Sequence, residues 1–126
     1  MTYQKILLID DDEDDQEIFV SALKQVAESV RCTTFDDARE ALGKLMSQEI
    51  LTDLIFLDLN MPIMNGQQFL IEIKKNAILH SIPVIVLSTS SHSGTIESTR
   101  ELGAEDFITK PDKFEDLIRI LESVLK

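Results

Sequence analysis

The stretch from Leu54 to Pro62, LIFLDLNMP, constrains the fold more than any other part of the chain. Its first four residues are all apolar, without the alternation expected of a strand that has one face in water. A run this short and uniform is typical of a central strand in a parallel sheet that is covered on both faces. Asp58 follows at the carboxyl end of this predicted strand, which is the edge where open α/β sheets bind ligands.

The length and composition indicate one ordinary globular domain. The chain has 126 residues, of which 44% are hydrophobic and 28% are charged, and this is enough for a core that needs no disulfide or metal. We expect a single domain over residues 1–126 with no output domain. The net charge of −11 argues against sequence-independent binding to DNA or to an anionic membrane, because both require a basic surface.

The start of the chain and its one cysteine predict a cytoplasmic protein. The apolar run from Ile6 to Ile9 is too short for a signal peptide or a membrane span. Cys32 is the only cysteine, so no internal disulfide forms and a reducing compartment is expected.

Short apolar runs alternate with helical periodicity along the whole chain. Each predicted strand is followed by apolar residues at helical spacing. Strict alternation of this kind predicts an α/β fold, in which a five-stranded parallel sheet has helices on both faces and right-handed crossovers. The predicted strands are Lys5–Ile9, Val30–Phe35, Leu54–Leu57, Pro83–Leu87 and Asp106–Thr109.

Two helices carry local predictions. Asp36 precedes the second helical pattern and is predicted to be its N-cap, because a short side-chain oxygen accepts hydrogen bonds from the first helical N–H groups. The helix predicted over about Thr95 to Leu102 has few apolar anchors beyond Ile96 and Leu102. We expect it to be the least firmly held helix, because burial of an apolar face supplies most helix stability.

Polar residues lie where four of the predicted strands end, and the predicted topology gathers these ends around one pocket. Three close carboxylates repel one another unless a cation compensates them, and oxygen ligands favour Mg²⁺, with Mn²⁺ or Ca²⁺ as alternatives. A metal, a lysine and a hydroxyl facing one carboxylate are the groups that stabilise a transferring phosphoryl group. The residues concerned are Asp10, Asp11, Asp58, Ser88, Thr89 and Lys110.

Each of these residues has a simpler explanation when it is taken alone. Asp58 could be a turn residue, and the acids that begin at Asp10 could form a solvated helix start. Ser88 could be a loop hydroxyl, and Lys110, which precedes Pro111, could be an exposed turn residue. Their joint placement at four strand ends favours a shared site, with Asp58 as a nucleophile that accepts a phosphoryl group.

Four segments of the sequence resemble the receiver domain of two-component response regulators. The resemblance covers essentially the whole chain and implies a CheY-like, flavodoxin-like (βα)5 fold. Its most specific part is DLNMP followed by Asn65 and Gly66. The four segments are LLIDDD, FLDLNMPIMNG, VIVLSTS and FITKP.

The resemblance implies a Mg²⁺ site, with Mn²⁺ as an alternative metal. Asp58 would be the phosphoacceptor, Asp11 a direct metal ligand and Asp10 a ligand through water. Asn60 would offer its backbone carbonyl to the metal. Asp12 extends the usual acidic pair to three, which leaves open which two acids approach the ion.

The same resemblance implies roles on the other two strands. Ser88 would donate a hydrogen bond to a phosphoryl oxygen, Lys110 would pair with the phosphoryl group, and Phe107 would be an aromatic switch residue. Two further positions depart from the family pattern. Thr89 is larger than the usual residue and is expected to narrow access to the pocket, and Phe107 lacks the hydroxyl of the tyrosine often found there.

The implied function is signalling and not enzymatic turnover in the usual sense, although such a domain promotes its own phosphorylation and dephosphorylation. The donor would be a sensor histidine kinase or a histidine phosphotransfer protein, and the output a contact with a downstream protein, without direct DNA binding. The domain would be a monomer or a phosphorylation-linked dimer. We expect the output face to combine the helix at Thr95–Leu102, the strand at Asp106–Thr109 and the last helix.

Two other functions compete with this interpretation. Asp10 and Asp12 have the spacing of the nucleophile motif of haloacid-dehalogenase-like phosphatases, but Glu13 and Asp14 replace the apolar pair expected after it. A flavin-binding module on the same fold needs a phosphate-cradling loop after the first strand. This chain has acids there, and they would repel a phosphate.

Overall fold

Five parallel strands form one sheet through the centre of the molecule. The computed structural model describes residues 3–89 and 92–125. Within these residues the strand order is β2-β1-β3-β4-β5, and the predicted strands are confirmed apart from single-residue differences at β2 and β4. The strands are β1 (Lys5–Ile9), β2 (Arg31–Phe35), β3 (Leu54–Leu57), β4 (Val84–Ser88) and β5 (Asp106–Thr109).

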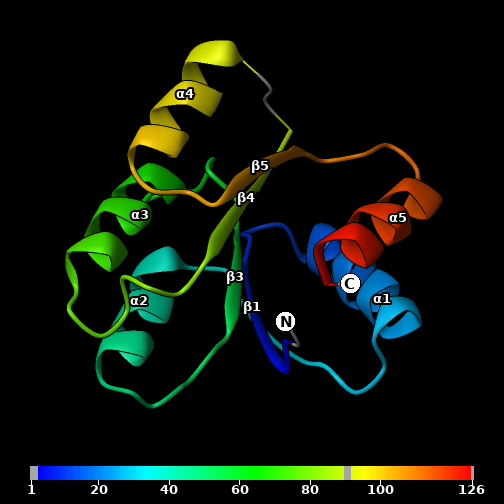
Figure 1. Cartoon of the computed structure of the whole chain (residues 1–126), viewed down its shortest axis with the longest axis horizontal. Helices are drawn as coiled ribbons and strands as arrows, with labels where there is room; N and C mark the ends of the chain where they lie inside the picture. Colours follow the sequence, from blue (N-terminus) through cyan, green and yellow to red (C-terminus); the bar gives the residue numbers. More distant parts are fainter. Residues whose placement is uncertain (1–2, 90–91, 126) are drawn as a thin grey trace.

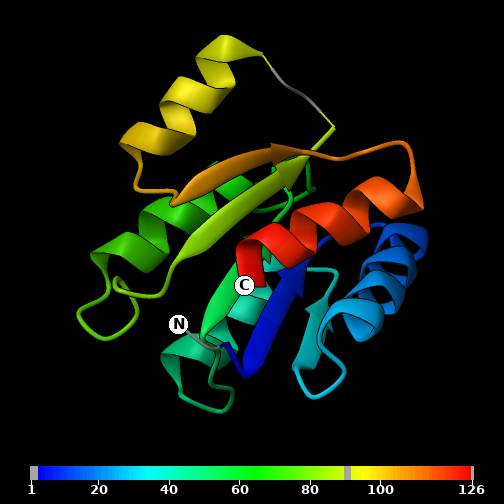
Figure 2. The same cartoon turned by 45° about the vertical axis from the view of Figure 1, so that its right-hand side comes forward.

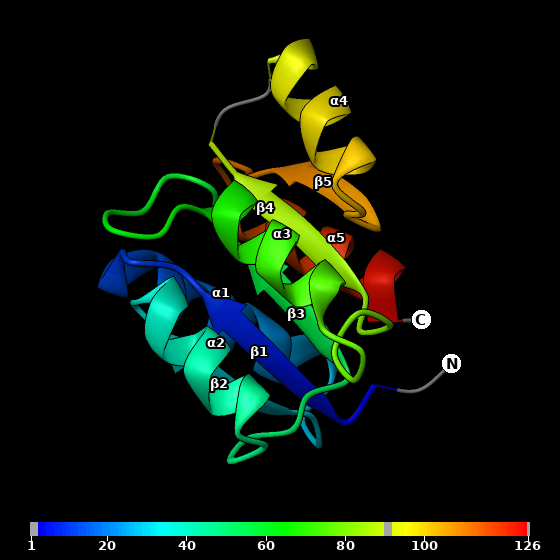
Figure 3. The ribbon, with the colours of Figure 1, turned by 90° about the vertical axis from the view of Figure 1, so that its left-hand side faces the viewer.

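Helices cover both faces of the sheet, as the alternating pattern predicts. Figure 1 shows α1 and α5 on one side, α2 and α3 on the other, and α4 beside β5. In Figure 2 α1 and α5 lie next to each other, and in Figure 3 α2 and α3 lie in front of the strands. The helices are α1 (Glu13–Val26), α2 (Ala38–Met46), α3 (Gly66–Lys75), α4 (Ser93–Glu101) and α5 (Phe114–Leu125).

The uniformly apolar strands supply two cores at once. In β3, Ile55 and Leu57 pack into the core under α2 and α3, whereas Leu54 and Phe56 pack into the core under α1 and α5. All four are fully buried. The Phe56 ring meets Phe19 of α1 edge to face, with the ring centroids 4.9 Å apart. A strand with this pattern therefore needs a helix layer on each side.

Side-chain caps set where the helices begin. Asp12 caps α1 by accepting from the N–H of Asp15, and Asn65 forms a capping box with Gln68 at α3. The predicted cap of α2 is wrong by one residue, because Asp37 and not Asp36 accepts from the first helical N–H groups. The chain is still tied to β1 at Phe35, whose carbonyl accepts from the N–H of Asp10, so Asp36 is used in the turn that follows.

The shallowest anchoring among the described helices is that of α4. Thr99 is its one fully buried residue, and the predicted anchors Ile96 and Leu102 are only half-buried. By contrast, α3 buries Phe69, Leu70 and Ile73. The fold therefore holds α4 against β5 with little apolar burial. Among the described residues, no helix is both long enough and apolar enough to cross a membrane.

A close backbone approach predicts that Gly66→Ala is destabilising. The added Cβ would lie 2.6 Å from the carbonyl oxygen of Asp58 and 2.8 Å from the Cα of Leu59, and backbone atoms cannot move aside as a flexible side chain can. We expect the free energy of unfolding, measured in urea, to fall by about 2 kcal/mol.

Gly43→Ala is the matched control. No atom lies within 4 Å of a Cβ added at Gly43 inside α2, and alanine is the better helix former by about 1 kcal/mol. We expect this variant to keep or gain stability. An unchanged stability of Gly66→Ala would show that the approach at Asp58 is not a tight one.

Candidate functional site

The candidate site lies at the carboxyl edge of the sheet, where polar residues follow apolar strands. Asp10 comes directly after β1, Asp58 directly after β3 and Lys110 directly after β5, while Ser88 is the last residue of β4. Backbone hydrogen bonds continue past the strand ends. The N–H of Asp58 donates to the carbonyl of Ile9 at 2.9 Å, and that of Lys110 to the carbonyl of Ser88 at 2.8 Å. The sheet therefore brings these four residues to one edge.

Three carboxylates converge at this edge. Asp10, Asp11 and Asp58 each offer one oxygen, and the three oxygens lie within 4.8 Å of one another. Asp10 is 2% exposed and Asp58 7% exposed, whereas Asp11 faces solvent. The N–H of Asp12 donates to the Asp10 carboxylate at 3.0 Å, and the amide of Gln16 donates to the Asp10 carbonyl. Asp10 is thus held in place from α1.

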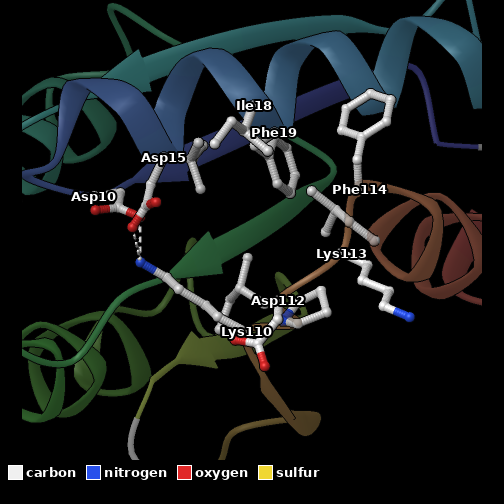
Figure 4. A pocket seen from close by; sticks show the side chains of 12 residues that line it. Asp10, Asp15, Ile18, Phe19, Lys110, Asp112, Lys113 and Phe114 are labelled. Carbon is white, nitrogen blue, oxygen red and sulfur yellow. Dashed lines mark hydrogen bonds and ion pairs between the residues drawn. The ribbon is translucent and has the colours of Figure 1, made fainter.

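The side chain of Lys110 extends from the end of β5 to the acids near β1 and α1. Its ammonium donates to Oδ2 of Asp10 and to Oδ2 of Asp15, both at 2.8 Å, as the dashed lines in Figure 4 show. Oδ2 of Asp58 is 3.9 Å from the same nitrogen. The side chain of Lys110 is 14% exposed. A largely buried positive charge therefore lies between carboxylates from β1, α1 and β3.

Burial has the largest effect on the pKa values of Asp10 and Asp58. Loss of hydration raises the pKa of Asp58 to about 6, against the opposing charge of Lys110. Burial also raises the pKa of Asp10, and the hydrogen bond from Lys110 cancels only part of this rise. Burial alone would lower the pKa of Lys110, but the hydrogen bonds to Asp10 and Asp15 outweigh that effect and raise it. Lys110 is consequently a fixed positive charge beside Asp10 and Asp58, two carboxylates whose ionisation is made costly by burial.

The donor set fits a small, hard cation. Oxygens around Mg²⁺ at about 2.1 Å lie roughly 3 to 4 Å from one another, and the three carboxylate oxygens already lie within 4.8 Å of one another. Carboxylate ligands select Mg²⁺ or Mn²⁺ over softer metals. A divalent ion would also relieve the repulsion among Asp10, Asp11 and Asp58 that Lys110 balances only in part.

The remaining predicted residues surround this cluster. Asn60 lies in the turn after β3, and the hydrogen bond from its backbone N–H opposes part of the burial-driven rise in the pKa of Asp58. Ser88 is fully buried, and Thr89 after it is exposed. Phe107 is half-buried in β5 and lines a cavity of about 100 Å³ between α4 and β5, together with Thr99. Phe107 thus belongs to the α4 side of the sheet edge.

The sequence and the fold match one family. A family model described as the response regulator receiver domain matches residues 6–122. The chain belongs to this family. Among curated relatives, the two-component response regulator ARR6 of Arabidopsis thaliana is 32% identical over 96% of this chain and 69% of its own length. ORR8 of Oryza sativa subsp. indica is 32% identical over 98% of this chain and 100% of its own length.

Solved structures agree with this assignment. The crystal structure of the phosphorylated cyanobacterial phytochrome response regulator RcpA has a TM-score of 0.89 and 32% identity, and covers 98% of this chain and 91% of that one. The Mn²⁺-bound form of the response regulator Rcp1 has a TM-score of 0.86 and 29% identity, and covers 96% of this chain and 91% of that one. The CheY-like fold predicted for this receiver domain is confirmed.

The acids that follow β1 lie in different environments, and the sequence alone does not distinguish them. Asp12 is the N-cap of α1 and lies outside the cluster formed by Asp10, Asp11 and Asp58. Asp15 pairs with Lys110, although the sequence marks it only as an acid near a helix N-terminus. The available signal is that helical side chains point back toward the N-terminus, which aims a first-turn carboxylate at the sheet edge.

The pKa of Asp58 predicts a pH-dependent gain in stability for Asp58→Asn. The folded-state pKa is about 6 against an ordinary 3.8, so the unfolded chain binds fewer protons between these values. The wild type should therefore lose stability as the pH rises from about 4 to about 6. In metal-free buffer we expect the variant to gain roughly 3 kcal/mol above pH 6 and much less near pH 4.

Urea unfolding with a chelator at both pH values measures this gain. Asp14→Asn removes a charge from an exposed position of α1 and is expected to change the free energy of unfolding by less than about 0.5 kcal/mol. A gain for Asp58→Asn that is the same at both pH values would contradict the burial of an ionisable Asp58.

Proposed function

We propose that this receiver domain is a two-component signalling switch, phosphorylated on Asp58 in a Mg²⁺-dependent transfer from a histidine kinase or a histidine phosphotransfer protein. The observation that carries the proposal is a buried carboxylate at the end of β3 that faces two further carboxylates and Lys110. The relatives support it, since RcpA was crystallised in a phosphorylated form and Rcp1 with Mn²⁺.

Asp58 supplies the nucleophile in this proposal. One carboxylate oxygen attacks the phosphorus of a phosphohistidine, so that the P–O bond forms as the P–N bond breaks and the departing imidazole takes up a proton from solvent. A Mg²⁺ ion held by Asp10, Asp11, Asp58 and the Asn60 carbonyl would neutralise charge on the phosphoryl oxygens. Because the site is half-enclosed by the sheet edge and α1, charges in it act more strongly than in bulk water.

Lys110 and Ser88 stabilise the product. The ammonium of Lys110 is 3.9 Å from Asp58, within reach of a phosphoryl oxygen attached there, and the hydroxyl of Ser88 lies at the adjoining strand end. The same groups promote dephosphorylation, in which water attacks phosphorus, inorganic phosphate leaves and the Asp58 carboxylate is regenerated. The domain thus promotes both steps without being an enzyme in the usual sense.

The proposed output face consists of α4, β5 and α5. Phosphorylation adds a charge of about −1.5 to −2, which draws Ser88 and Lys110 toward Asp58. The ends of β4 and β5 are joined by the hydrogen bond from the Lys110 N–H to the Ser88 carbonyl, so both strand ends respond. The cavity beside Phe107 and the shallow anchoring of α4 at Thr99 leave room for repacking there.

The partners in this proposal are proteins. A kinase or phosphotransfer protein supplies the phosphoryl group and a downstream protein reads the output face, while the domain stays monomeric or pairs when phosphorylated. The net charge of −11 disfavours direct contact with DNA. We propose a cytoplasmic location, because the half-buried free thiol of Cys32 requires no oxidising compartment.

Phosphorylation by a small phosphodonor tests the acceptor. After incubation with acetyl phosphate and Mg²⁺, mass spectrometry should find one labile phosphate in the wild type and none in Asp58→Asn. Asp12→Asn is the matched control, because its carboxylate caps α1 and lies outside the cluster, and it should still be phosphorylated. Phosphate on Asp10 in place of Asp58 would favour a phosphatase and overturn the proposal.

Amide hydrogen exchange tests the output face. With beryllofluoride and Mg²⁺ as a mimic of the phosphorylated state, we expect protection to change between Ser88 and Phe114 and to stay constant in α2 (Ala38–Met46), which is distant from β5 in the sheet order. Unchanged exchange from Ser88 to Phe114 in a protein that binds beryllofluoride would exclude this face.

A further inference from the structure

A fourth carboxylate reaches the site from α1. Oδ2 of Asp15 accepts from the ammonium of Lys110 at 2.8 Å, the same distance as Oδ2 of Asp10, and Figure 4 shows the two acids side by side at the tip of Lys110. Among the described residues Asp15 does not belong to the carboxylate cluster that could hold a metal. Its contact with the site therefore runs through Lys110.

The fold places Asp15 and leaves it space to move. Its N–H donates to the N-capping carboxylate of Asp12 at 3.0 Å, which fixes its backbone in the first turn of α1. Its side chain is 38% exposed and borders a cavity of about 230 Å³ that Ile18 and Phe114 also line. The Asp15 carboxylate can therefore leave Lys110 without disturbing the core.

We propose that Asp15 is a positioning residue that restrains Lys110 in the unphosphorylated protein and competes with the phosphoryl group for its ammonium. This inference rests on the proposed function. An ammonium has three N–H donors, and Asp10 and Asp15 engage two of them. At 3.9 Å, Asp58 is outside hydrogen-bond distance, so Lys110 is held close to the nucleophile without being bonded to it.

Removal of Asp15 should favour the phosphorylated state. A phosphoryl group on Asp58 carries about −1.5 to −2 charges and attracts Lys110 more strongly than the Asp58 carboxylate does. In Asp15→Asn the phosphoryl group no longer competes with the Asp15 carboxylate for the Lys110 ammonium. The variant also lacks one negative charge that would repel the phosphoryl group. Asp15 thus raises the concentration of phosphodonor at which the domain switches.

The contact itself is tested without metal or ligand. Side-chain ¹H–¹⁵N spectra of lysine ammonium groups, assigned with Lys110→Arg, should show a protected Lys110 signal in the wild type, since two carboxylates hold the group. Asp15→Asn should shift or broaden this signal. Asp14→Asn makes the same charge change at an exposed neighbouring position and should leave the Lys110 signal unchanged. Asp15→Glu keeps a carboxylate and should shift the signal less than Asp15→Asn does. An unmoved signal in Asp15→Asn overturns the proposal.

The competition is tested by titration with beryllofluoride at fixed Mg²⁺, followed by NMR. We expect Asp15→Asn to bind about threefold more tightly than the wild type, which is the size typical of a partly exposed ion pair. Asp14→Asn should change the affinity less. In a Lys110→Ala background the effect of Asp15→Asn should shrink, because residues that act through one another are not additive.

The possible outcomes separate the two proposals. Equal or weaker binding in Asp15→Asn, or the same gain with and without Lys110, overturns the role of Asp15 while the proposed function stands. If wild type and Asp58→Asn respond alike to beryllofluoride, the proposed function fails, and the lysine spectra still decide whether Asp15 holds Lys110.

Discussion

The burial of Asp10 and Asp58 beside Lys110 is the constraint on which the rest of the structure depends. Two helix layers exclude water from the sheet and so make ionised carboxylates at its edge costly. Lys110 offsets part of that cost through its hydrogen bond to Asp10, and the pKa of Asp58 nevertheless rises to about 6. The apolar strands thus build an edge that is short of positive charge, and in the proposed function a divalent cation supplies that charge.

Much of the fold follows from the sequence because two-sided burial leaves a clear pattern. The apolar run in β3 serves two cores with alternate residues, and a helical stripe follows each strand. The error at the start of α2 has a local cause. Asp36 and Asp37 are equal as capping residues, and the choice of Asp37 depends on how far β2 stays bonded to β1, which the sequence of the turn does not encode.

The positions of the strand-end residues of the site could be predicted from the sequence, whereas the different roles of the individual acids could not. Asp10, Asp58 and Lys110 lie together because parallel strands end at one edge. Asp12 and Asp15 are chemically identical, yet one caps a helix and the other holds Lys110. That difference arises from the rotation of α1 about its axis and from the path of a long lysine side chain. Neither of these is encoded by the identity of the two residues.

The parallel register between β1 and β3 has a consequence for how such a domain can diverge. Ile9 and Leu57 are partners in this register, so Asp10 and Asp58 are separated by one inter-strand spacing, about 4.8 Å. The sheet therefore fixes the backbone positions from which the Asp10 and Asp58 side chains converge, and their carboxylate oxygens lie within 4.8 Å of each other and of an Asp11 oxygen. This backbone arrangement can be kept while much of the sequence changes, which agrees with a TM-score of 0.89 at 32% identity.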